Sequence, residues 1–268
     1  MRSGFVSFKS SRIHYLQTGN GRNVIVAFHG FGEPARTFGV LKNHIEEHHT
    51  LIAIDLPLHG DTSWNEGLEL LPTDLITIIN SIPEIGTNSI SLAGFSMGGR
   101  VCLSLFELMP DRIEKLILLA PDGLIVNPLY RLATRSKWGN RFFYKTMKDP
   151  GWFMKFANFL KKAKLVNKSV HKFSTEFLKQ PEARMALYRI WTLMNKFRPN
   201  LKKIKSLVKS RNTRIVLVFG QHDRIITPKL AKRLSIGIES QCELIILNSG
   251  HNILNERNAG ELESIFNS

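Results

Sequence analysis

Residues 89–103 are predicted to form a strand, a sharp turn and a helix, and this stretch constrains the fold more than any other. Apolar residues lead into the run 94–98 (Gly-Phe-Ser-Met-Gly), after which the apolar positions change to helical spacing. A serine on so tight a bend takes a strained backbone conformation, tolerated only where the residues two before and two after it lack a bulky Cβ. Gly94 and Gly98 meet that condition, so the Ser96 hydroxyl is expected to project above a sheet.

Short apolar runs with the length of buried strands occur on both sides of this turn. They lie at residues 24–28, 51–54, 90–93, 113–119, 215–219 and 243–247. Between residues 24 and 120, helix-like patterns alternate with these runs, which is typical of a parallel sheet with helices on both faces. The sequence therefore predicts an α/β fold with a mostly parallel, twisted sheet, preceded by extended structure in the first residues.

The alternation stops at residue 121 and returns near residue 211. Residues 121–210 contain 21 Lys and Arg against 4 Asp and Glu, so this segment carries the excess positive charge of a chain whose net charge is +15. The apolar spacing within it suits helices better than strands. We predict a core domain formed by residues 1–120 and 211–268, with a helical insertion at residues 121–210.

The positive charge of the insertion allows three interpretations. The simplest is a solvated surface on helices. The second is attraction of an anionic substrate or peripheral contact with an acidic membrane surface. The third is nucleic-acid binding, which is disfavoured because no recognition motif is present and the aromatic residues fall at core-like helical spacing.

Length, cysteine content and hydropathy argue against a disulfide-linked, secreted or membrane-spanning protein. With 268 residues the chain can form one sizeable core, or a core with a small appendage. Cys102 and Cys242 show no paired spacing, which favours two reduced thiols over a disulfide or a metal site. Neither a signal peptide nor an apolar stretch approaching the ~18 residues of a membrane span is found, so a cytoplasmic protein is expected.

Two residues outside the turn complete a candidate catalytic group. A serine hydroxyl is a poor nucleophile at neutral pH, so attack on an acyl carbon needs a histidine base and a carboxylate that holds the tautomer of that histidine. Such groups should follow the carboxyl ends of strands. His251 comes soon after the last apolar run, and Asp223 comes four residues after the run at 215–219. We predict Ser96 as nucleophile, His251 as base and Asp223 as acid.

Two backbone N–H groups are needed to stabilise the oxyanion of a tetrahedral intermediate, and losing one such donor raises the barrier by roughly 3–4 kcal/mol. Met97 follows the nucleophile at a helix amino terminus and is predicted to supply one donor. The loop after the first buried run, residues 29–32 (His-Gly-Phe-Gly), leaves room for close backbone approach. Phe31 in that loop is predicted to supply the second, with His29 bracing the loop.

Several motifs together resemble the α/β-hydrolase superfamily, in its serine-nucleophile branch with a cap. In chain order they are His29-Gly30-Phe31-Gly32, Asp55-Leu56-Pro57 with His59-Gly60, Gly94-Phe95-Ser96-Met97-Gly98-Gly99, Gly220-Gln221-His222-Asp223 with Pro228, and Gly250-His251. The order Ser, Asp, His along the chain is also that of the family. The resemblance implies that 121–210 is the cap, or lid, over the pocket. One departure is Leu58, where relatives often have glycine.

One further residue and one further motif are alternatives to these assignments. Asp122 follows the run at 113–119, where some relatives place the catalytic acid, but it sits in a Pro-Asp-Gly sequence that suits a plain loop. Residues 44–48 match a His-x-x-Glu-His zinc pattern. That segment ends a predicted helix away from the catalytic edge, so no metal site is expected, and no cofactor is needed for the chemistry.

The predicted function is a serine hydrolase that cleaves a carboxylic ester or related acyl substrate, anionic or apolar, through an acyl-enzyme. One alternative is a lyase similar to the menaquinone-pathway synthase that eliminates pyruvate. It is suggested by the cationic insertion and by Arg100, which follows Gly98 and Gly99 and is a candidate substrate contact. Another alternative is a ligand receptor that keeps the triad without turnover. The oligomeric state is left open.

Overall fold

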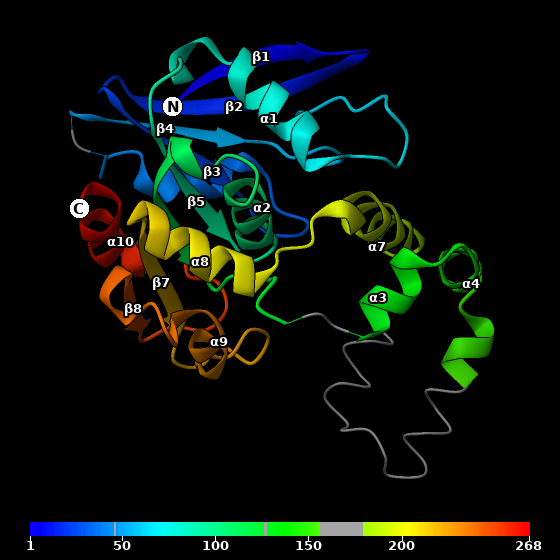
Figure 1. Ribbon diagram of the computed structural model, residues 1–268. Coiled ribbons are helices and arrows are strands. Elements are labelled where there is room, and N and C mark those ends of the chain that lie inside the picture. Colours follow the sequence, from blue (N-terminus) through cyan, green and yellow to red (C-terminus); the bar gives the residue numbers. More distant parts are fainter. Residues whose placement is uncertain (46, 126–127, 156–178) are drawn as a thin grey trace. The chain divides into compact units, whose positions relative to one another are not determined.

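The computed structural model describes residues 1–45, 47–125, 128–155 and 179–268. Contacts within the chain divide it into two compact units, one formed by residues 1–125 with 196–268 and the other by residues 126–195. The larger unit contains a sheet with its helices, and the described residues of the smaller unit form helices (Figure 1).

The larger unit is built on an eight-stranded sheet with the order β1-β2-β4-β3-β5-β6-β7-β8. The strands are β1 (Arg2–Phe8), β2 (Ser11–Gly19), β3 (Asn23–Phe28), β4 (His49–Ile54), β5 (Ile90–Phe95), β6 (Ile113–Leu119), β7 (Arg214–Gly220) and β8 (Cys242–Leu247). β2 pairs antiparallel with both β1 and β4, whereas every other neighbouring pair is parallel. The predicted mostly parallel sheet is confirmed, and each predicted apolar run lies within a strand.

Helices cover both faces of this sheet, which explains why the central strands are apolar along their whole length. On one face, the 3-10 helix η1 (Ala35–Leu41) and α10 (Ala259–Asn267) pack in a cluster with alternate residues of β3 to β7. The helix α2 (Met97–Phe106) contacts β3, β5 and β6 but adds no residue to that cluster, so it covers the other face. All ten residues of α2 are buried.

The remaining helices of the larger unit are short and connect the strands. They are α1 (Pro72–Ser81), α8 (Leu201–Arg211) and α9 (Ala231–Ser235), with the 3-10 helices η2 (Pro83–Ile85), η3 (Pro110–Arg112), η5 (Pro228–Leu230), η6 (Glu239–Gln241) and η7 (Glu256–Asn258). The helix α1 contacts α2, and α8 contacts α9 and η3. Crossover segments of this kind join parallel strands, because such strands cannot be linked by a tight hairpin.

The smaller unit contains α3 (Pro128–Arg135), α4 (Lys137–Lys148) and α7 (Pro181–Leu193), followed by the 3-10 helix η4 (Met194–Lys196) where the chain returns to the larger unit. Phe143 of α4 lies with its ring centre 5.5 Å from that of Tyr188 and 5.6 Å from that of Trp191, both on α7. Arg184 on α7 donates from Nε to the carbonyl oxygen of Met147 at 2.7 Å. Aromatic packing and this hydrogen bond hold α4 against α7.

The predicted insertion at 121–210 overlaps this helical unit without coinciding with it. Residues 126–127 and 156–178 of the insertion lie outside the described residues. Its last part forms α8, which belongs to the larger unit because the backbone N–H of Asn200 and the Nζ of Lys203 both reach Glu107 after α2. That residues 121–210 act as a cap stays a prediction.

Membrane spans and disulfides were both expected to be absent. Within the described ranges, no helix is long and apolar enough to cross a bilayer. Cys102 and Cys242 are both free thiols. Burial raises the pKa of the Cys102 thiol, and it raises that of Cys242 to about 11, so neither thiol is a ready nucleophile at neutral pH.

Candidate active site

Ser96 lies in the sharp turn between β5 and α2. Its backbone angles are φ 51° and ψ −112°, a conformation that L-amino acids rarely adopt. A Cβ atom on Gly94 would lie 2.4 Å from the carbonyl oxygen of Gly98, and one on Gly98 would lie 1.9 Å from the carbonyl oxygen of Phe28. The strand and the helix thus approach so closely that glycine is required at both positions.

The structure brings the three predicted catalytic side chains within hydrogen-bonding distance. His251 Nε2 lies 3.1 Å from Ser96 Oγ, and His251 Nδ1 lies 2.7 Å from Asp223 Oδ2. The three residues follow β8, β5 and β7, whose carboxyl ends meet at one edge of the parallel sheet. With its Nδ1 proton donated to the carboxylate, the imidazole presents a lone pair on Nε2 to the serine hydroxyl.

Backbone groups hold the Asp223 carboxylate in place. Its side chain is fully buried, and its Oδ1 accepts hydrogen bonds from the N–H groups of Ile225 at 2.7 Å and Ile226 at 2.9 Å. The other oxygen is left for His251. These two backbone donors prevent the carboxylate from turning away from the imidazole.

Asp122, the rival acid, has different partners. Its Oδ2 lies 3.3 Å from Nε of Arg100, and its backbone N–H donates to the carbonyl oxygen of Ser96 at 2.8 Å. Arg100 is buried in α2, one turn after the nucleophile. The carboxylate of Asp122 therefore pairs with Arg100, whereas His251 bonds to Asp223. A role for Arg100 as a substrate contact stays a prediction.

The two residues predicted to form an oxyanion hole lie in different loops. Met97 is the first residue of α2, where backbone N–H groups have no acceptor inside the helix. Phe31 lies in the loop after β3, and 36% of its surface is exposed. Within the described part of the chain, the structure gives no hydrogen-bond acceptor to the backbone N–H of either residue. An N–H group without an acceptor in the protein is one condition for an oxyanion hole, and the roles of Phe31 and Met97 as its donors stay predictions.

Two buried histidines tie the loop after β3 to the loop after β4. Nε2 of His29 accepts a hydrogen bond from the N–H of Leu56 at 3.0 Å, and its Nδ1 lies 2.8 Å from the Gly30 carbonyl oxygen. Nε2 of His59 accepts from the N–H of Gly32 at 3.2 Å. The bracing predicted for His29 is present, and His59 holds the same loop.

These hydrogen bonds require neutral imidazoles. An Nε2 atom that accepts a hydrogen bond carries no proton, and the ring centres of His29 and His59 lie 4.7 Å apart. Burial, followed by the neighbouring imidazole of His59, lowers the pKa of His29 to about 3. Burial also lowers the pKa of His59. Both rings are therefore neutral at pH 7, and the loop that carries Phe31 is held without adding a charge beside His251.

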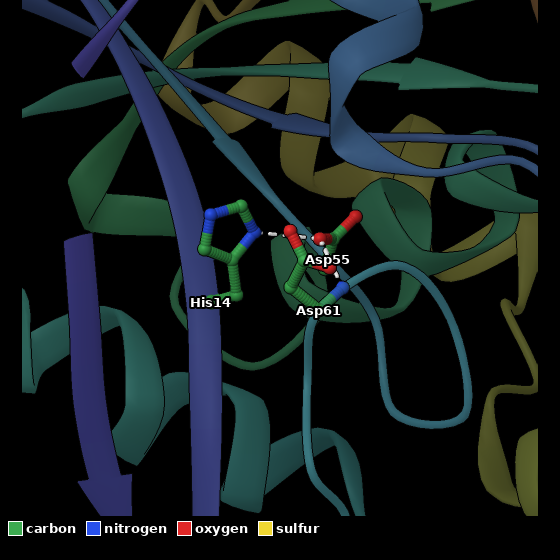
Figure 2. A group of neighbouring side chains, drawn as sticks. All are labelled: His14, Asp55 and Asp61. Carbon is green, nitrogen blue, oxygen red and sulfur yellow. Dashed lines mark hydrogen bonds and ion pairs between the residues drawn. The ribbon is translucent and has the colours of Figure 1, made fainter. Parts of the chain in front are cut away.

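The turn after β4 is organised around Asp55, as Figure 2 shows. Oδ2 of Asp55 lies 2.6 Å from Nδ1 of His14 and accepts from the N–H of Asp61 at 2.9 Å, while Oδ1 accepts from the N–H of Ala35. A Cβ on Gly60 would collide with this carboxylate. His14, Asp55 and Asp61 form a group with metal-ligand chemistry, but both Asp55 oxygens already bond within the protein.

In the segment with the zinc-like pattern, residues 44–48, His44 contacts the last helix of the chain. His44 Nδ1 pairs with the carboxylate of Glu263 on α10, and the backbone carbonyl of His44 accepts from the side-chain amide of Asn267. Glu46 lies outside the described residues. His44 therefore attaches the segment after η1 to the last helix, at a distance in sequence of more than two hundred residues.

Glu33 is a candidate functional residue that sequence reasoning missed. It directly follows the loop that carries Phe31, is half-buried, and has an Oε2 atom that is fully buried without a hydrogen-bond partner. Burial raises the pKa of its carboxyl group, and the proximity of His251 opposes that shift. In the sequence, Glu33 could have been noticed as an acidic residue next to the predicted oxyanion loop. Its proximity to His251 could not have been predicted, because it depends on how the loop folds.

Comparison with known proteins gives one family. A model described as the alpha/beta hydrolase family matches residues 25–264. Among curated proteins, the chain is 22% identical over 240 residues to the uncharacterized hydrolase YugF of Bacillus subtilis, which covers 88% of this chain and 86% of that protein. It is 26% identical over 112 residues to esterase Rv0045c of Mycobacterium tuberculosis, covering 41% of this chain and 37% of that protein.

Solved structures show the same fold. The thioesterase domain from the curacin biosynthetic pathway superposes with a TM-score of 0.66 at 20% identity, covering 99% of each chain. The serine hydrolase CCSP0084 from Cycloclasticus zankles superposes with a TM-score of 0.66 at 18% identity, covering 99% of this chain and 97% of that one. At these identities the two structures support the architecture, and the roles of individual residues need their own argument.

The strain at Ser96 predicts a stability difference between two variants that both remove the hydroxyl. Ser96→Ala keeps a Cβ at φ 51°, whereas Ser96→Gly removes it, so the glycine variant should exceed the alanine variant by about 1 kcal/mol in free energy of unfolding. Urea unfolding monitored by circular dichroism measures this difference. Equal stabilities would mean that the turn is not strained at this residue.

The close approach at Gly98 predicts a loss of stability on adding one methyl group. Gly98→Ala places a Cβ against the carbonyl oxygen of Phe28 and should lower the free energy of unfolding by about 2–4 kcal/mol. Gly260→Ala is the matched control, because a Cβ there meets no atom within 4 Å on α10 and should be neutral or stabilising. Similar unfolding midpoints for the two variants would contradict the packing argument.

The neutral histidines predict acid sensitivity. Below about pH 6.5 histidines in the unfolded chain take up protons while His29 stays neutral in the fold, so the unfolded state binds more protons and stability falls as pH falls. Each histidine that stays neutral contributes a slope of about 1.4 kcal/mol per pH unit. His59→Gln keeps an acceptor for Gly32 and should reduce the slope just below about pH 6.5 in urea titrations, because burial lowers the pKa of His59 in the fold. Parallel profiles for the two proteins would refute a neutral His59.

Proposed function

The chain belongs to the alpha/beta hydrolase family, and on that premise we propose that it is a serine hydrolase that cleaves a carboxylic ester or a related acyl substrate through an acyl-enzyme intermediate. Its curated and structural relatives include hydrolases and esterases, which supports the general class. The observation that carries the specific proposal is the hydrogen-bonded series from Ser96 through His251 to Asp223.

In the first half of the proposed reaction, Ser96 attacks the acyl carbon. His251 Nε2 takes the proton from Ser96 Oγ as the new carbon–oxygen bond forms, and the carbonyl electron pair moves onto the substrate oxygen. The N–H groups of Phe31 and Met97 then donate to that oxyanion. When the intermediate collapses, the bond to the leaving oxygen breaks and His251 returns the proton to the departing alcohol.

The second half repeats these steps with water. His251 accepts a proton from the water molecule, whose oxygen bonds to the acyl carbon, and the bond to Ser96 Oγ then breaks as the proton returns to it. Asp223 stabilises the imidazolium that forms in each half and keeps the proton of the neutral ring on Nδ1. No metal or cofactor takes part in this sequence.

The lyase alternative was suggested by Arg100 and by the cationic insertion. Its pairing with Asp122 supplies the guanidinium with a counter-charge inside the protein, which favours the esterase proposal over recognition of a polyanionic substrate. A burst of nitrophenol from a nitrophenyl ester supports the esterase, whereas release of pyruvate without an acyl intermediate supports the lyase. Negligible turnover with ligand-dependent partner binding supports a receptor.

Two further expectations from the sequence stay predictions. They are a cap formed by residues 121–210 and a cytoplasmic location.

The proposal predicts that Ser96 reacts with an active-site probe. Wild-type protein should be labelled covalently by a fluorophosphonate, and Ser96→Ala should not be labelled, because the probe forms its bond with an activated serine oxygen. Intact-protein mass spectrometry measures the adduct. Labelling of Ser96→Ala to the same extent as wild type would reject Ser96 as the nucleophile.

The acid can be tested by a matched pair of substitutions. Asp223→Asn should lower kcat/KM for a short-chain nitrophenyl ester by about 10³ to 10⁴, because the amide no longer holds the required tautomer of His251. Asp122→Asn, which alters the partner of Arg100, should change kcat/KM by less than about tenfold. The reverse pattern would assign the acid role to Asp122.

A further inference from the structure

The helix α4 in the smaller unit exposes aromatic side chains on the face opposite its packed side. Phe143 and Met147 are buried against α7, whereas Trp138 is 83% exposed and Phe142 is 58% exposed. Trp138 and Phe142 are four residues apart, so they lie on the same face of the helix, one turn from each other. Large aromatic rings at this exposure are uncommon on a protein surface that contacts only water.

Positive charge surrounds these rings. From the start of α3 to the end of α4, residues 128–148 contain six Lys and Arg and no Asp or Glu. These are Arg131, Arg135, Lys137, Arg141, Lys145 and Lys148. By helical spacing, Lys145 continues the stripe of Trp138 and Phe142, and Lys137, Arg141 and Lys148 form the adjacent stripe. All four of these cations on α4 are exposed.

A surface hollow lies where the two kinds of side chain meet. It has a volume of about 570 Å³ and is lined by Phe142, Lys145, Lys148, Asp149 and Trp152. The ring centres of Phe142 and Trp152 lie 5.1 Å apart, so they form one apolar wall beside two ammonium groups. Asp149, the one carboxylate there, accepts a hydrogen bond from the N–H of Gly151.

We propose that this surface, formed by Trp138, Phe142 and Trp152 with the cations of α4, binds the protein to anionic phospholipid bilayers. A helix with aromatic residues on one stripe and Lys or Arg on the next lies in the plane of the interface, with rings among the headgroups and cations on the phosphates. Charge complementarity selects the lipid, because the exposed cations of α4 match a negatively charged surface. The surface is independent of Ser96, so the inference does not depend on the proposed reaction.

The test measures binding of the full chain to vesicles of phosphatidylcholine alone and with about 30 mol% phosphatidylglycerol, at about 0.1 M and 0.5 M salt. Wild type should cosediment with the anionic vesicles, more weakly at high salt, and not with the neutral ones. The double variant Lys145→Gln with Lys148→Gln should bind anionic vesicles about 25-fold more weakly, at about fivefold per cation. Trp138→Ala with Phe142→Ala should bind at least about tenfold more weakly.

Matched controls come from the larger unit. Lys202→Gln with Lys209→Gln removes two exposed cations from α8, and Ile236→Ala removes an exposed apolar side chain, so both should bind vesicles like wild type. Thermal unfolding checks that every variant is folded. Absence of binding to anionic vesicles, or equal weakening by the α8 controls, overturns the proposal. Oligonucleotide binding is measured on the same proteins. If the Lys145/Lys148 variant loses oligonucleotide binding while its vesicle binding is unchanged, the surface is a nucleic-acid site and the proposal is overturned.

Discussion

The candidate site depends on one strained residue that the sheet and α2 force into place. Ser96 takes a backbone conformation that costs on the order of 1–3 kcal/mol, and the buried packing of β5 and α2 offsets that cost. The close approach at Gly94 and Gly98 fixes the direction of the hydroxyl, and the same turn places the Met97 N–H at the start of a helix. The proposed nucleophile and one proposed oxyanion donor therefore come from a single local geometry.

Around that turn, the loops are held by two neutral histidines and by the carboxylate of Asp55. His29 and His59 are neutral because burial opposes protonation, and they bind backbone N–H groups through their lone pairs. Asp55 keeps the neighbouring turn closed with its own hydrogen bonds to His14 and backbone donors. The carboxylate that contacts His251 is Asp223. Glu33 is a second carboxyl group near His251, and burial raises its pKa.

Sequence patterns predicted the sheet well because each central strand is buried on both faces and so is apolar throughout. The same patterns could not place His59, whose hydrogen bond to Gly32 joins two loops more than twenty residues apart. They disfavoured zinc at the spacing around His44 but could not identify the partner of that histidine, which is Glu263 on the last helix. A spacing rule describes neighbours on one helix or strand, whereas these contacts form only when distant segments pack.

The sequence by itself determined the alternation of strands and helices, the need for glycine on both sides of Ser96, and the order of the candidate nucleophile, acid and base. Tertiary structure decided which carboxylate bonds to His251, because Asp122 and Asp223 both follow strands and differ only in what packs beside them. It also decided which residues of the cationic segment face solvent, since Trp138 and Phe143 look alike in sequence and differ by their position relative to α7. Local chemistry limits what each residue can do, and packing selects its partner.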